Sequence, residues 1–175
     1  VVYLLAPALL YWQWVAPVDD WARARGDASV HERYYDGLLG FLGAQRGGPF
    51  RVEIPFTDNH SEAHWVAPHV PLARGWERQV DRERNALFYD DRPLTPARYR
   101  RWLDDNAVRF VALADAPIDY SAAREAALVR SGTPYLREVW HDAHWRVFAV
   151  AGARPLASGT ARVTGCAPPT TNRST

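Results

Sequence analysis

Three of the chain's six histidines lie in the stretch FTDNHSEAHWVAPH, together with two carboxylates. His60 and His64 stand four residues apart, and positions four apart on a helix share one face. Two such imidazoles would bind a zinc ion if Asp58 or His69 supplied a third ligand. A zinc-protease helix, however, has its glutamate directly after the first histidine, whereas Glu62 comes two residues after His60. A polar binding loop, or histidines satisfied at the surface, are therefore the favoured interpretations.

A second group of polar residues follows in PLARGWERQ. An aromatic ring beside the forked donors of arginine suits a sugar ring or a phosphate. The alternative is a tryptophan that anchors the loop to the core, with its charged neighbours solvated. Together the two stretches give the candidate ligand-binding residues, which are Asp58, Asn59, His60, Glu62, Arg74, Trp76, Glu77 and Arg78.

The chain has no other motif that predicts catalysis. Carboxylates occur as neighbours at Asp90-Asp91 and Asp104-Asp105, but a hydrolase needs two carboxylates that face each other across a bond. The sequence contains neither a glycine-rich phosphate loop nor a G-x-S-x-G nucleophile elbow. We therefore predict no catalytic residue, no cofactor and no metal centre other than the weak histidine hypothesis.

Composition excludes further classes of protein. The formal net charge of +1, from 21 basic and 20 acidic residues, argues against a nucleic-acid-binding protein, which carries a basic excess. Cys166 is the only cysteine, so the chain has neither an intrachain disulfide nor a cysteine-rich zinc site.

The first eighteen residues, VVYLLAPALLYWQWVAPV, contain no charged side chain. Eighteen apolar residues are at the threshold for a helix that spans a bilayer about 30 Å thick. Tyr11, Trp12 and Trp14 lie near the end of the stretch, where amphipathic rings favour the headgroup level. Because the first residue is Val rather than Met, we expect a longer parent protein. Residues 1–18 are thus predicted to end a transmembrane helix, with a buried core helix or strand as the alternative.

The residues that follow have the pattern of a small α/β domain over 19–152. Capping and apolar periodicity predict helices over 29–48, 93–106 and 120–132, with Ser29 and Thr95 as N-caps. Short strands are predicted over 49–56 and 107–115, and a strand hairpin over 135–150 with its turn at residues 141–143. This order predicts a small mixed sheet with flanking helices and a C-terminal β-hairpin. Residues 153–175 are predicted to be a loose tail.

The segments DDNAVRFVALAD and YLREVWHDAHWRVFAVAG, after an apolar stretch with an aromatic end, resemble the C-terminal extracytoplasmic domain of bacterial polytopic membrane proteins of the GT-C glycosyltransferase type. The resemblance extends to about Gly152. It implies sugar transfer from a lipid-phosphate donor outside the cytoplasm. The acidic catalytic residue of that family lies in an early loop with no counterpart here, so the resemblance assigns no catalytic residue to this chain.

The expected function is therefore that of an accessory extracytoplasmic domain at the cell membrane. Its expected partners are the membrane domain of its own parent protein and a lipid-linked sugar or glycan; no nucleic acid is expected. Two alternatives stay open at the sequence level. One is a metal-dependent enzyme that uses His60 and His64, and the other is a non-catalytic, membrane-tethered interaction domain.

Overall fold

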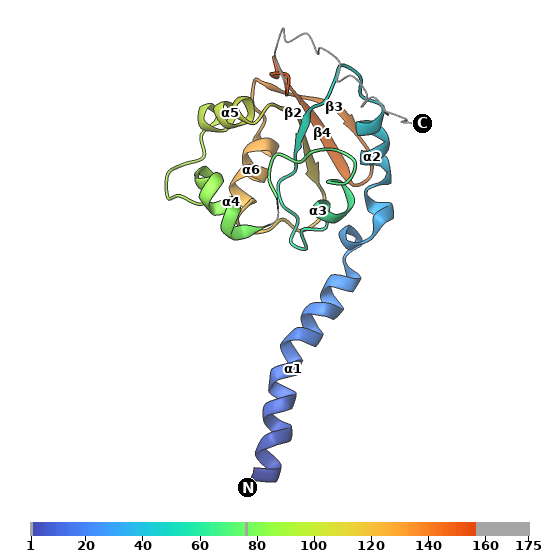
Figure 1. The fold of residues 1–175 in the computed structure, drawn as a ribbon, viewed down its shortest axis with the longest axis vertical. Helices are drawn as coiled ribbons and strands as arrows, with labels where there is room; N and C mark the ends of the chain where they lie inside the picture. The colour runs from blue at the N-terminus through green and yellow to red at the C-terminus, as the bar shows by residue number, and fades with distance from the viewer. Residues whose placement is uncertain (1, 76, 157–175) are drawn as a thin grey trace, which may run out of the picture.

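The computed structural model describes residues 2–75 and 77–156 as a three-layer α/β domain from which a long helix projects (Figure 1). The helices are α1 (Val2–Gly26), α2 (Asp36–Gly43), α3 (Glu62–Trp65), α4 (Arg78–Arg84), α5 (Pro96–Asp105) and α6 (Ala123–Ser131), with 3-10 turns at Ala28–Val30, Glu32–Tyr34 and Ala86–Phe88. The strands are β1 (Arg51–Glu53), β2 (Val108–Ala114), β3 (Leu136–His141) and β4 (Trp145–Val150).

The four strands form one mixed sheet in the order β1-β2-β4-β3. Strands β1 and β2 run parallel, whereas β2 pairs antiparallel with β4, and β4 antiparallel with β3. The β3–β4 hairpin turns at residues 142–144, one residue later than predicted. The predicted α/β class, the mixed sheet and the C-terminal hairpin are therefore confirmed.

Strand β2 is covered on both faces, as its nearly continuous apolar sequence predicts. On one face Phe110 and Ala112 pack with residues of α2 and with Trp145. On the other face Val111 and Leu113 pack with residues of α5 and α6. Figure 1 shows α2 on one side of the sheet and α5 and α6 on the other. Because it is fixed on both faces, β2 holds the segments at its two ends in place.

Local signals correctly predict α5 and α6. The Thr95 side chain accepts a hydrogen bond from the Arg98 amide, and Pro96 occupies the first turn. Helix α5 buries Tyr99, Trp102 and Leu103, which is the face that the sequence indicates. Helix α6 ends at Gly132, whose φ of +79° suits glycine. These two helices cover the sheet face opposite α2.

The single helix predicted over residues 29–48 is wrong. Two 3-10 turns precede α2, which begins only at Asp36. Ser29 does not cap a helix: it is completely buried, and its carbonyl accepts a hydrogen bond from the Tyr35 hydroxyl at 2.9 Å. Asp27 is the capping residue, because its carboxylate accepts the Ser29 amide at 2.8 Å. Tertiary burial of Tyr35 thus overrides the local capping pattern.

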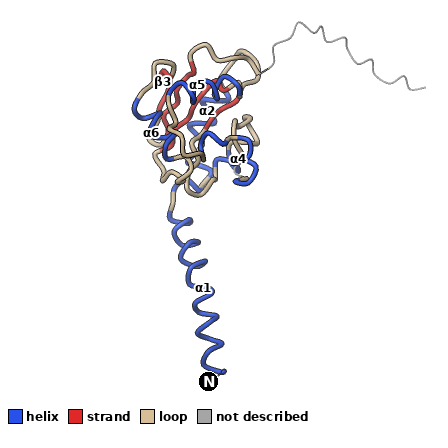
Figure 2. The backbone as a smooth tube through the Cα atoms, turned by 90° about the vertical axis from the view of Figure 1, so that its left-hand side faces the viewer, coloured by secondary structure: helices blue, strands red, loops and turns tan. Residues whose placement is uncertain are grey.

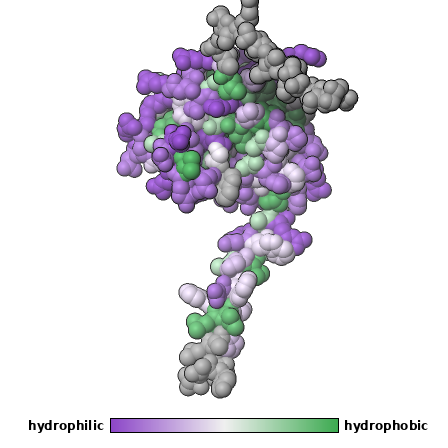
Figure 3. All heavy atoms as spheres, in the orientation of Figure 1, coloured by the Kyte–Doolittle hydropathy of each residue, from purple (hydrophilic) through white to green (hydrophobic). Residues whose placement is uncertain are grey.

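Helix α1 continues past Pro17 to Gly26 and projects away from the domain, as Figures 2 and 3 show. The rings of Trp12 and Trp14 are 80% and 62% exposed. None of the helices in the described part of the chain is both long and apolar enough to cross a membrane. The prediction that residues 1–18 end a transmembrane helix stays a prediction, and most of the tail predicted over 153–175 lies outside the described residues.

Candidate functional site

The loops that follow β1 and β2 meet at one edge of the sheet, because the two strands are parallel. The Asp58 amide donates to the Pro117 carbonyl at 2.9 Å, and the Asp119 amide donates to the Phe56 carbonyl at 2.9 Å. In open α/β sheets, ligands bind beyond the carboxyl ends of the parallel strands. The topology therefore places the predicted polar loop where this class of fold forms sites.

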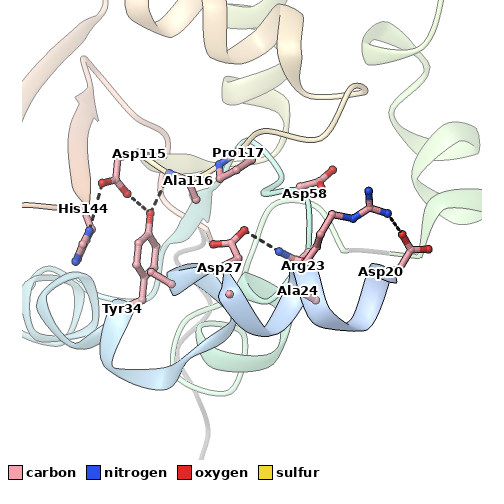
Figure 4. A pocket seen from close by; sticks show the side chains of 13 residues that line it. Asp20, Arg23, Ala24, Asp27, Tyr34, Asp58, Asp115, Ala116, Pro117 and His144 are labelled. Carbon is pink, nitrogen blue, oxygen red and sulfur yellow. Dashed lines mark hydrogen bonds and ion pairs between the residues drawn. The ribbon is translucent and has the colours of Figure 1, made fainter. Parts of the chain in front are cut away.

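A hollow of about 770 Å³ lies between these loops and the end of α1 (Figure 4). We call it the foot pocket, because α1 joins the domain there. Four aspartates line it against one arginine, so its charge is negative. Its polar lining residues are Asp20, Arg23, Asp27, Tyr34, Asp58, Asn59, Asp115 and His144.

Three side chains from separate segments form the domain wall of the foot pocket, as Figure 4 shows. Asp115 directly follows β2, accepts a hydrogen bond from the Tyr34 hydroxyl, and lies 3.3 Å from Nδ1 of His144. The ring centroids of Tyr34 and His144 are 4.6 Å apart. Burial, and then the bond to Asp115, raise the pKa of Tyr34, so its hydroxyl stays a donor. The carboxylate and the imidazole are thus held in fixed positions at the pocket surface.

The opposite wall comes from α1 and the turn after it. Asp27 accepts a hydrogen bond from the Asn59 side chain at 2.8 Å, which ties the turn to the predicted loop. On α1 itself, Asp20 forms an ion pair with Arg23, which follows it by three residues and so lies on the same face of the helix. The pocket therefore contains two of the predicted residues, Asp58 and Asn59, and offers mainly hydrogen-bond acceptors. Such a surface suits hydroxyl or ammonium groups and disfavours phosphate.

His60 and Glu62, further along the same stretch, belong to a second, more buried group of polar side chains. His60 has a φ of +52°, which is uncommon for a residue with a side chain. Its Nδ1 lies 3.8 Å from Glu62 Oε1, and neither atom has a hydrogen-bond partner in the described part of the chain. Burial raises the pKa of Glu62 to about 7, although the Thr57 hydroxyl donates to it at 2.6 Å. Burial lowers the pKa of His60, so its imidazole is mostly neutral near neutral pH.

Arg78 joins the same group from α4. It donates to Asp119 at 3.0 Å and lies 3.5 Å from Nε2 of His60, which is itself 3.6 Å from Asp119. Hydrogen bonds from Ser121, together with Arg78, lower the pKa of Asp119 against the effect of its burial. Three of the predicted residues are thus brought together at the His60 ring, with Glu62 near its Nδ1 and Arg78 near its Nε2.

The Arg74 side chain is completely buried rather than open to a ligand. It bonds to Glu53 at 2.8 Å and to Glu125 at 2.7 Å. The rings of Phe56 and Phe88 lie on it, with centroids 4.2 and 3.9 Å from the guanidinium carbon. Burial raises the pKa of both glutamates against the lowering effect of Arg74. This arrangement makes Arg74 a core ion-pair centre and argues against direct contact with a ligand.

The other predicted residues fall elsewhere. Glu77 is exposed at the start of α4, and Trp76 lies outside the described residues. Among the described residues, no three His, Cys, Asp or Glu side chains converge as metal ligands. His60 and His64 turn to different partners, Phe56 and Trp65 respectively. The structure therefore does not bring His60, His64 and Asp58 together as the hypothetical zinc site.

Sequence reasoning missed Tyr34, Asp115 and His144. One signal for Asp115 is present, since it directly follows the most apolar strand, where α/β sheets place their sites. Tyr34 and His144 carry no such signal, because their approach depends on how distant segments pack. No family model, curated protein or solved structure matches the chain, so its resemblance to GT-C proteins stays a prediction.

Proposed function

We propose that the chain is the extracytoplasmic α/β domain of a multi-spanning, glycosyltransferase-like membrane protein, and that it binds the sugar part of a lipid-linked sugar or glycan. The observation that carries the proposal is the position of the foot pocket. Residues of α1 line it, and the same helix exposes described apolar side chains further from the domain, among them Leu10, Trp12 and Trp14.

Distances along α1 support a position of the foot pocket close to the membrane surface. The rise of an α-helix places Asp20 roughly 9 Å along the axis from Trp14. If the exposed rings of Trp12 and Trp14 lie at the headgroup level, the pocket opens just above the lipid surface. A sugar attached to a lipid would project to that height. The chain itself is then an accessory domain, and catalysis belongs to its membrane-embedded partner.

The chemistry of the pocket matches a sugar better than a phosphate. Carboxylates accept hydrogen bonds from hydroxyl groups, and the partly exposed ring of His144 lies beside them. The four aspartates repel a phosphate group, so the lipid-phosphate end of such a ligand would lie toward the membrane rather than in the pocket.

The test is saturation-transfer NMR with a panel of neutral sugars and amino sugars. We expect at least one sugar to contact the protein, and we expect an Asp58→Asn/Asp115→Asn double variant to lose most of that contact. Asp91→Asn is the matched control, because Asp91 is exposed and lines none of the described pockets. Absence of sugar binding, with the fold intact, would favour the alternative of a tethered interaction domain.

A further inference from the structure

A second hollow, of about 540 Å³, lies at the other end of the sheet. Arg109, near the start of β2, lines it, whereas Asp115 of the foot pocket follows the end of the same strand. The strand rise places these two residues roughly 20 Å apart. Three arginines, Arg109, Arg137 and Arg154, line this hollow, which we call the arginine pocket.

The floor of the arginine pocket is a row of paired residues across three strands. Phe110 of β2 is opposite Ala149 of β4, and Ala149 is opposite Arg137 of β3. The small side chain of Ala149 leaves depth between the ring and the arginine. Phe41 and Phe50 pack edge-on against Phe110 at 5.5 and 5.3 Å, so one wall is aromatic.

The positive charge of this pocket is not balanced within the domain. None of its three arginines forms an ion pair with a described residue, and no acidic side chain is among the described residues that line it. Other surface arginines, such as Arg98 and Arg146, do pair with carboxylates. Residues 157–175 contain two arginines and no Asp or Glu, so their side chains offer no counter-charge.

Arg109 is also held in a defined position. Its Nη1 donates to the Arg46 carbonyl at 2.7 Å, and its guanidinium lies 5.2 and 5.1 Å from the rings of Phe50 and Phe110. An arginine fixed in this way loses little conformational freedom when its other N–H groups bind an anion.

We propose that the arginine pocket binds a phosphate ester that carries a small ring, such as a sugar phosphate. Guanidinium groups bind phosphate oxygens through paired hydrogen bonds, and three of them match a group with about two negative charges. The aromatic wall packs against the ring of the ligand, and the volume lies within the range of small-molecule sites. The site stands independently of the function proposed for the foot pocket, because it lies at the opposite end of the strands.

Titration calorimetry at low salt, with glucose 6-phosphate as the probe, tests the proposal. We expect binding that weakens as salt is added, and a loss of about tenfold in affinity for Arg137→Gln, because one charge-assisted pair is removed. Arg137 is exposed, so this variant keeps the fold. Arg101→Gln is the matched control: Arg101 is an exposed arginine on α5 that lines none of the described pockets, and we expect unchanged affinity.

Three further probes each lack one part of the proposed ligand. Glucose has no charge and should not bind. Inorganic phosphate has no ring and glucuronate has only one negative charge, so both should bind more weakly than glucose 6-phosphate. The proposal is overturned if glucose 6-phosphate does not bind, if Arg137→Gln and Arg101→Gln weaken binding equally, or if any of these probes binds as tightly as the ester.

Discussion

Glu62 is a carboxyl group that water hardly reaches, since its side chain is 1% exposed. One of its oxygens accepts from Thr57, and the other faces His60 without a hydrogen bond. A carboxyl in such surroundings favours the neutral form, which explains why burial brings its pKa to about 7. Near neutral pH, ionisation of this single residue therefore makes the stability of the polar loop depend on pH.

The raised pKa predicts how stability depends on pH. The folded state holds the proton more tightly than the unfolded chain, so the stabilisation is complete below the ordinary pKa of 4.5 and is lost as the pH rises through about 7. Glu62→Gln should remove this contribution, which amounts to about 3 kcal/mol over that window. Urea unfolding at several pH values measures it. Glu83→Gln, at an exposed position, is the control, and equal pH slopes in wild type and Glu62→Gln would contradict the prediction.

Sequence predicts part of the candidate site at this scale. The polar loop contributes Asp58 and Asn59 to the foot pocket, as expected for a binding loop. The sequence gives no sign, however, that Arg74 is buried between Glu53 and Glu125, because both glutamates lie far from Arg74 in the chain. A charged residue in an irregular segment looks the same in sequence whether it faces water or a distant carboxylate.

At the scale of elements, α2 contacts the β3–β4 hairpin through a glycine. A Cβ atom at Gly37 would collide with Asp142 and would lie 3.3 Å from the Trp140 ring. Asp142 cannot move freely, because its carboxylate accepts the amides of His144 and Trp145 and so fixes the turn. The close approach of helix and hairpin therefore requires glycine at this position.

Gly37→Ala should destabilise the domain by about 1–3 kcal/mol, because the turn must shift or lose a hydrogen bond. Gly40→Ala, on the same helix with open space around it, should instead stabilise the domain by about 0.5–1 kcal/mol, as alanine favours helix. Thermal unfolding of both variants gives the comparison. Similar effects at the two positions would mean that the helix does not approach the hairpin this closely.

Elements with complete local signals were predicted correctly. The capped helix α5, the apolar strand β2 and the C-terminal hairpin all depend on patterns within about a dozen residues. The structure of residues 29–48 was predicted incorrectly, because the burial of Tyr35 and its hydrogen bond to the Ser29 carbonyl determine the path of the chain there. A capping pattern does not report a tertiary contact.

At the scale of the whole molecule, α1 and the domain are nearly independent in packing. Trp12 and Trp14 have most of their surface uncovered. Under the proposed function, these rings contact lipid. A Trp12→Asp/Trp14→Asp variant should therefore lose at least tenfold in binding to phosphatidylcholine–phosphatidylglycerol vesicles, with no change in the melting temperature of the domain.

Vesicle flotation and calorimetry measure these two properties. Val80→Asp, which alters an exposed apolar residue on α4, should leave vesicle binding unchanged. If the double variant binds vesicles as well as wild type does, α1 does not provide the membrane contact. If it also lowers the melting temperature, α1 packs on the domain more than the structure indicates.

The parallel pairing of β1 with β2 also affects the order in which the sheet assembles while the protein is synthesised. Arg51 pairs with Val108, and a ribosome adding 5–20 residues per second needs roughly 3–11 seconds to synthesise the segment between them. During that time β1 has no partner strand. The pairing of β4 with β2, for example Phe110 with Ala149, joins residues closer in the sequence than Arg51 and Val108, so it forms more readily. We therefore expect the sheet to nucleate on strands synthesised late, and the foot pocket to be completed only when β1 docks onto them.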